Sequence, residues 1–165
     1  KLIFIPFPED VIIVRKTLLK LGMGAQVKEF EKSINYAAEL ASNSSKDIIV
    51  DAIRGMNISD AFSIINGKEN AATEYLHKQT FLILLQKFQP IIRKAISSAD
   101  VTRHWKLLIK RYNSVPFTKG IDISLEEYIT AKTIEGLFVL IAKEEVNIRN
   151  NVEARKTLLI QKIFK

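Results

Sequence analysis

The chain has 165 residues, of which 47% are hydrophobic and 26% are charged. This composition is typical of a folded domain and not of a disordered segment. The chain contains no cysteine, which excludes disulfide bonds, thiol nucleophiles and thiolate metal sites from this stretch. The formal net charge is +7, and its distribution along the chain is the most informative feature of the sequence.

The excess positive charge is concentrated in residues 87–119. This segment has eight basic residues and one acidic residue, so its net charge of +7 equals that of the whole chain. Its charged residues are Lys87, Arg93, Lys94, Arg103, Lys106, Lys110, Arg111 and Lys119, together with Asp100. Local charge of this kind binds or steers an anionic partner.

The elements predicted along the chain are helices after an extended start. Residues 1–8 contain two prolines and are expected to be extended, and Pro8 suits the first turn of a helix. Apolar residues then recur at helical spacing and predict helices over residues 8–21, 25–41, 46–54, 59–65, 70–88, 101–112, 124–150 and 153–164. The expected N-caps are the serine cluster 42–45, Ser59 and Ser124, and Pro90 should kink or restart its helix.

No segment alternates with a period of two between turn signals. The sequence therefore predicts an all-α fold, a compact multi-helix bundle that forms a single domain over residues 1–165. The longest apolar runs, 81–85 and 137–142, fall well short of the ~20 residues of a transmembrane helix. Because the chain starts at Lys1 without an initiating Met, we expect residues that precede it to be missing.

The sequence offers little for catalysis or metal binding. It has two histidines, and the Glu-x-x-His spacing of a di-metal bundle site occurs once, at Glu74 and His77, where such a site needs it twice. No Gly-x-Ser-x-Gly elbow and no Gly-rich phosphate loop is present. Glu144 and Glu145 are adjacent on a helix and point apart, so we expect a solvated face with Glu145 near Arg149. We therefore expect a protein that is not an enzyme and has no cofactor.

The helix predicted from residue 101 has two distinct faces. Its apolar stripe consists of Val101, Trp105, Leu108 and Tyr112. Its basic residues, the first candidates for partner binding, are Arg103, Lys106, Lys110 and Arg111. They form either an ordinary solvated face or a surface for an anionic lipid, an acidic protein or a nucleic acid.

Two of these partner classes are less favoured. No nucleic-acid-binding signature is visible, and Trp105 and Tyr112 are assigned to the core and not to base stacking. Binding to a membrane surface needs free apolar side chains, whereas this helix should spend its apolar stripe on the bundle. A second candidate surface is the apolar tip of the loop over residues 113–123, formed by Val115, Pro116 and Phe117.

Short motifs spread over the whole chain form a specific combination. They are Ile5-Pro6-Phe7-Pro8, Asn35-Tyr36-Ala37-Ala38-Glu39, Asp51-Ala52-Ile53 with Met56, Asp60 and Ala61, Asn66-Gly67, Ala71-Ala72-Thr73-Glu74-Tyr75, Phe88-Gln89-Pro90, Tyr112-Asn113 with Pro116-Phe117, Tyr128-Ile129-Thr130, Glu135-Gly136-Leu137-Phe138, Glu144-Glu145, Ile148-Arg149 and Ala154-Arg155-Lys156-Thr157. In this order the chain resembles the bacterial domain of unknown function 4197 family. The resemblance implies an N-terminal signal and one more, leading helix that are missing from this chain. It thus implies an exported, periplasmic protein, and it supplies no catalytic residues.

Members of that family in bacteria of the Bacteroidetes type resemble a periplasmic plug subunit, which docks on the outer-membrane barrel of the type nine protein-export system and closes its inner mouth. The resemblance thus implies a non-catalytic protein that binds a large outer-membrane complex, tethered to that membrane if the missing N-terminus carries a lipid anchor. The alternatives are a periplasmic carrier of a lipid or another hydrophobic or anionic ligand and an uncharacterised enzyme. A carrier should show a continuous apolar cavity, and a plug should show a filled core.

Overall fold

The computed structural model describes residues 4–5, 12–98, 100–118, 121 and 123–164. Within them the chain forms helices and no strand, which confirms the all-α class and the single domain. The helices are α1 (Ile12–Lys20), α2 (Gly24–Ser42), α3 (Ser45–Arg54), α4 (Ile58–Ile65), α5 (Ala71–Ser98), α6 (Val101–Asn113), α7 (Leu125–Asn150), a 3-10 helix (Val152–Ala154) and α8 (Leu158–Ile163). The predicted start of the first helix at Pro8 lies outside the described residues.

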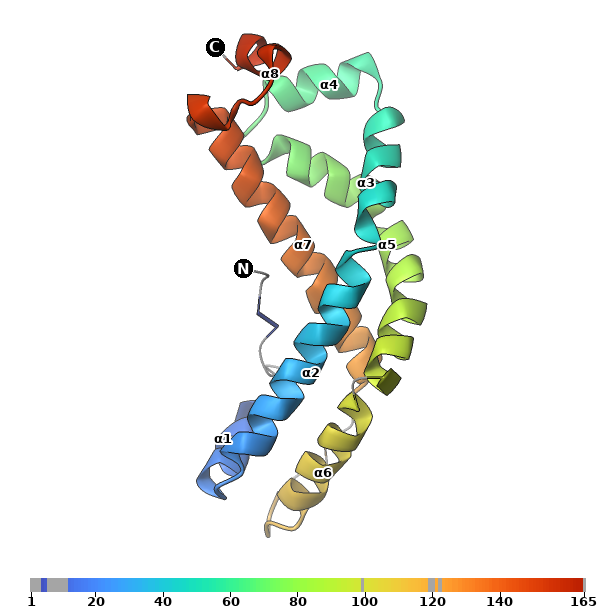
Figure 1. The fold of residues 1–165 in the computed structure, drawn as a ribbon, viewed down its shortest axis with the longest axis vertical. Coiled ribbons are helices and arrows are strands. Elements are labelled where there is room, and N and C mark those ends of the chain that lie inside the picture. Colours follow the sequence, from blue (N-terminus) through green and yellow to red (C-terminus); the bar gives the residue numbers. More distant parts are fainter. Residues whose placement is uncertain (1–3, 6–11, 99, 119–120, 122, 165) are drawn as a thin grey trace.

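The core lies between the three long helices α2, α5 and α7, which all contact one another. Their largest fully buried side chains are Phe30, Ile34, Leu84, Phe88, Ile92, Ile129 and Ile134. The shorter helices extend the bundle toward two ends. Figure 1 shows α1 and α6 at one end of the long axis and α4 and α8 at the other. Helices α1 and α6 also bury apolar side chains, among them Val14, Leu18 and Leu108, whereas α4 and α8 have no buried residue.

Helix α5 is continuous across Pro90, where the sequence left a kink or a restart open. Proline removes the hydrogen bond to the carbonyl of Gln86, four residues earlier. Both residues are exposed, so water can hydrate the freed carbonyl. Figure 1 shows that α5 changes direction along its length. The Thr80 hydroxyl donates to the Leu76 carbonyl at 2.7 Å, and such a bond from a side chain to the preceding turn commonly bends a helix.

One predicted N-cap, Ser59, is wrong, whereas the N-cap predicted within residues 42–45 is Ser44. Helix α4 is capped by Asn57 and not by Ser59: the Asn57 side chain accepts from the Asp60 N–H at 2.8 Å, and the Asp60 carboxylate accepts from the Asn57 N–H at 3.3 Å. Ser44, at the N-cap of α3, makes no capping bond with its side chain. The prediction for Ser124 is confirmed, since its side chain accepts from the Glu127 N–H at the start of α7.

The prediction of one continuous C-terminal helix over residues 153–164 is wrong. The chain forms one 3-10 turn, breaks, and begins α8 at Leu158 with Thr157 as N-cap. The break follows from Arg155, whose guanidinium donates to the carbonyls of Ile148 and Arg149 at 3.0 and 2.7 Å. These carbonyls lie at the end of α7 and have no partner within their own helix. Arg155 therefore caps α7.

Candidate functional site

Helix α6 is held in place by the apolar stripe that the sequence predicted. Val101, Leu108 and Tyr112 are buried, and Trp105 stacks on Phe30 of α2 with ring centroids 5.2 Å apart. Helix periodicity then places the basic residues on the outer side. The prediction that Trp105 and Tyr112 pack against the bundle is therefore confirmed.

All four basic residues of the candidate surface are exposed. We call Arg103, Lys106, Lys110 and Arg111 the basic face. Arg103 pairs with Asp100 at 3.2 Å, and both side chains are largely in solvent, so this pair contributes little to stability. Among the residues that the structure describes, no carboxylate lies within ion-pair distance of Lys106, Lys110 or Arg111. The basic face thus keeps most of its charge available to a partner.

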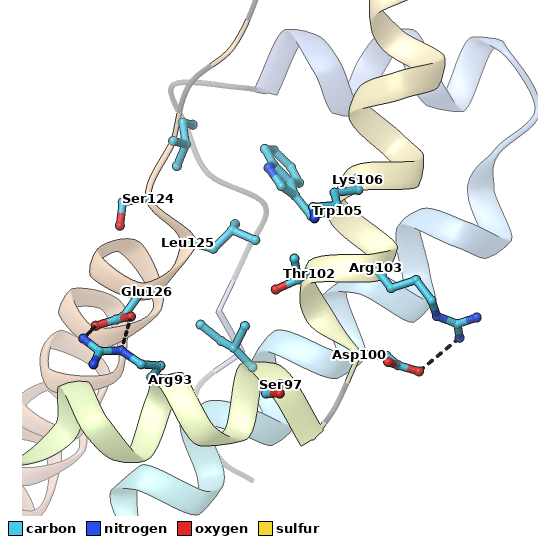
Figure 2. Close-up of a pocket in the computed structure, with 12 residues that line it drawn as sticks. Arg93, Ser97, Asp100, Thr102, Arg103, Trp105, Lys106, Ser124, Leu125 and Glu126 are labelled. Atoms are coloured by element: carbon cyan, nitrogen blue, oxygen red, sulfur yellow. Dashed lines mark hydrogen bonds and ion pairs between the residues drawn. The ribbon is translucent and has the colours of Figure 1, made fainter.

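A cleft of the described structure adjoins the basic face. It has a volume of about 880 Å³ and lies between the end of α5, the start of α6 and the start of α7. Figure 2 shows Thr102 and Trp105 on the α6 side, while Arg103 extends away from the cleft toward Asp100. Its walls also include the apolar side chains of Ile96, Ile123 and Leu125.

One ion pair closes the floor of this cleft between α5 and α7. Arg93 donates from Nε and Nη2 to the two carboxylate oxygens of Glu126 at 2.8 and 2.7 Å, as Figure 2 shows. The hydrogen bond from Arg93 holds the pKa of Glu126 below its ordinary value, and the same bond raises the pKa of Arg93. Because Arg93 and Glu126 saturate each other, neither is free as an acid or a base. The cleft therefore offers a binding surface and no evident catalytic dyad.

The loop after α6 presents one aromatic side chain fully to solvent. Phe117 has a relative exposure of 105% and a backbone φ of 66°, a left-handed conformation that costs a non-glycine residue about 1–2 kcal/mol. The turn is fixed from behind, because the Thr118 hydroxyl donates to the Val115 carbonyl at 2.9 Å. Pro116 is exposed and Val115 is half-buried. The predicted apolar tip therefore consists mainly of Phe117.

The described structure holds no metal cluster of three or more suitable side chains. His77 stacks against Phe81 and packs edge-on against Phe138, with centroids 5.1 and 4.6 Å apart. The Nδ1 atom of His104 is buried and has no hydrogen-bond partner among the described residues. His104 lines a small hollow of about 200 Å³ beside Gln26 and Glu29.

Two further grooves are apolar and bear on the carrier hypothesis. One, of about 510 Å³, runs between α2 and α7, and its walls include the exposed side chains of Phe4, Tyr36 and Leu140. The other, of about 350 Å³, lies between α4, α5, α7 and α8. Both grooves open at the surface, the first with some exposed walls and the second with walls that are mostly half-buried, whereas a carrier encloses most of its ligand. No helix in the described part of the chain is long and apolar enough to cross a bilayer.

The family model described as "Protein of unknown function (DUF4197)" matches residues 1–165. The chain belongs to the DUF4197 family. Neither a curated protein nor a solved structure matches it. The structure therefore has to supply the physical reasons for the motifs that the chain shares with this family.

The DUF4197 motif residues with the clearest contacts hold the fold together. The Asn35 side chain accepts from the Ile5 N–H at 2.7 Å and donates to the Ile5 carbonyl at 3.0 Å, which fixes Ile5 on α2. The Tyr75 hydroxyl donates to Asp60 at 3.1 Å and joins α5 to α4. These contacts are structural, and they point to no reaction.

The prediction that Glu145 and Arg149 form an i,i+4 pair is confirmed, but the prediction of a solvated face is wrong. Arg149 donates to Glu145 from Nε and Nη2 at 3.0 and 2.9 Å, and the two side chains are 9% and 10% exposed. Glu145 also accepts from the N–H groups of Ala72 and Thr73 and from the Thr73 hydroxyl, at 2.7–2.9 Å. It thus occupies the positive end of α5.

Arg149 completes this network on its other side. Its Nη2 donates to the carbonyl of Ile64 at the end of α4 at 2.7 Å, and its guanidinium lies 5.0 Å from the ring centroid of Phe164. Burial alone would raise the pKa of Glu145, but the hydrogen bonds from Thr73, Ala72 and Arg149 outweigh burial and lower it. The pair therefore ties α7 to the ends of α4 and α5.

Proposed function

We propose that this protein is a non-catalytic docking domain that binds a large outer-membrane protein through its basic face. The observation that carries the proposal is the group of cations on α6 that no described carboxylate neutralises. Charges of this kind speed association and fix orientation, while a few apolar anchors hold the complex. Phe117, in the loop that follows α6, is fully exposed.

The finer proposal is that the domain is periplasmic and occludes the inner mouth of a protein-export channel, as the plug subunit of the type nine system does. The family resemblance supports this, as does a rigid bundle with a filled core. The described grooves are open at the surface, which favours docking over the carriage of a hydrophobic ligand. The mutual pairing of Arg93 with Glu126 and of Arg149 with Glu145 favours docking over catalysis.

The test measures association of the domain with the purified type nine outer-membrane barrel over a salt series. The triple variant Arg103→Glu, Lys106→Glu and Lys110→Glu changes the charge by six and leaves a net charge of +1. We expect its association rate at low salt to fall at least about tenfold, with a flatter salt dependence. A control with the same charge change, Lys46→Glu, Lys78→Glu and Lys162→Glu, places the charges on α3, α5 and α8.

We expect the control to lose much less of the association rate than the basic-face variant. Circular dichroism should show the same helix content in both, because all six lysine and arginine side chains are exposed. If the basic-face variant associates at the wild-type rate throughout the salt series, the basic face is only a solvated surface and the proposal is wrong.

A further inference from the structure

Leu107 lies in the middle of the basic face. On a helix the surface neighbours of a residue lie three and four positions away, so Arg103, Lys110 and Arg111 surround Leu107, and Lys106 precedes it. Leu107 is 49% exposed. Residues 101–118 contain these four cations and no carboxylate. Leu107 lies outside the apolar stripe that packs on the bundle, and it is the apolar side chain that α6 leaves in solvent among these cations.

Further exposed apolar side chains lie at the same end of the molecule. Figure 1 shows the C-terminal end of α6 beside the turn between α1 and α2, at one end of the long axis. Leu21 is exposed in that turn, after the exposed Lys20. Met23 and Leu107 share an apolar hollow of about 470 Å³ with Lys106, Lys110, Arg111 and Ser114. Phe117 follows α6 directly and is fully exposed.

We propose that this end of the molecule binds the surface of an anionic phospholipid bilayer. The four cations would pair with lipid phosphates and anionic head groups, and Phe117 and Leu107 would enter the boundary between head groups and acyl chains. Basic side chains that surround apolar ones are typical of protein surfaces that lie in this boundary. Charge complementarity argues for anionic lipid, since each Lys or Arg near such a surface strengthens binding about fivefold.

The exposed aromatic side chain favours a bilayer over an acidic protein or a nucleic acid as occupant. The cations alone would suit any of the three. Phe117 is fully exposed to water and has a backbone φ of 66°. Insertion into the apolar region of a bilayer would remove its ring from water and would not require a pocket of matching shape. This inference goes beyond the proposed function, because it requires no protein partner. A domain docked on an outer-membrane barrel would have lipid head groups beside it.

The test is flotation of the purified chain with vesicles of phosphatidylglycerol and phosphatidylcholine, and with vesicles of phosphatidylcholine alone. We expect binding to the anionic vesicles, loss of that binding in high salt, and little binding to the neutral ones. Lys110→Gln with Arg111→Gln should weaken partitioning about 25-fold, at about fivefold for each charge. The matched control, Lys46→Gln with Lys162→Gln, removes two exposed charges from α3 and α8 and should change it less than about twofold.

Phe117 provides the readout for insertion. We expect Phe117→Ser to weaken partitioning several-fold and Phe62→Ser, an exposed phenylalanine on α4 at the other end, to leave it unchanged. A tryptophan in place of Phe117 should shift its emission to the blue on anionic vesicles and be quenched by bromine-labelled lipid. Trp105 is half-buried against Phe30 and serves as the constant background.

The proposal is overturned if the chain does not float with anionic vesicles, or if the α6 and control variants lose equal affinity. It is also overturned if Phe117→Ser binds like the wild type and the introduced tryptophan stays in water. None of these results affects the association test with the barrel, because the vesicles contain no protein. Circular dichroism of each variant excludes loss of fold as the cause.

Discussion

The buried pair of Glu145 and Arg149 provides the sharpest prediction about stability. In Glu145→Gln the side chain keeps its shape but loses its charge. Arg149, only 10% exposed, is then left without its carboxylate, and an amide group replaces an acceptor of the Ala72 and Thr73 N–H groups. Breaking a buried ion pair costs about 3–5 kcal/mol. Because glutamine can still accept some of these bonds, we expect a loss of about 3 kcal/mol.

The measurement is thermal and denaturant unfolding at neutral pH, followed by circular dichroism. For a domain of this size each kcal/mol shifts the midpoint by about 2–4 °C, so the melting temperature should fall by about 6–12 °C. The control is Glu144→Gln, which removes the neighbouring and exposed carboxylate of the same helix and should stay within about 0.5 kcal/mol of the wild type. If Glu145→Gln is as stable as Glu144→Gln, the buried ion pair contributes no more to stability than an exposed ion pair, and the argument is wrong.

The same pair predicts a pH dependence. The pKa of Glu145 in the folded protein lies below its ordinary value of 4.5, so the folded state favours the charged form. Its contribution is therefore complete above pH 4.5 and is lost as the pH falls through the lower, folded pKa. The stability difference between Glu144→Gln and Glu145→Gln should be largest at neutral pH and shrink in acid. A difference that stays constant into strong acid would contradict the argument.

Two glycine substitutions test the turns. At Gly67 an added Cβ would lie 2.6 Å from both Ala71 Cβ and the Ser63 carbonyl oxygen, so Gly67→Ala should destabilise the protein by about 1–3 kcal/mol in denaturant unfolding. Gly55→Ala, where the nearest atom is 3.5 Å away, is its control and should be close to neutral. Gly22 has a φ of 77° and open space around it, so Gly22→Ala should cost about 1 kcal/mol through backbone strain alone. If Gly22→Ala does not change the free energy of unfolding, the backbone of the turn between α1 and α2 must adjust to accept the alanine.

The sequence predicts the local features of this fold well because they depend on neighbours along the chain. The stripe of Val101, Leu108 and Tyr112 follows from helical spacing, and it is buried. The capping bond of Ser124 follows from a residue three positions later. Even so, Ser59 and Asn57 both suit an N-cap, and residue preference alone does not choose between them.

The features that the sequence misses depend on contacts between distant residues. Glu145 is buried because it meets Ala72 and Thr73, 73 and 72 positions away, and a helical pattern alone assigns it to solvent. The position of Phe117 in a left-handed turn has no glycine or asparagine signal that could have indicated it.

The two ends of the molecule use charge in opposite ways. At the end with α4 and α8, Glu145, Arg149 and Arg155 all bind the unpaired groups of helix termini, so their charge is consumed inside the protein. At the α6 end, three cations face solvent with no partner among the described residues. The proposal of docking therefore depends on the charge that α6 leaves exposed to solvent and on the family resemblance, and the paired charges at the other end contribute to stability instead.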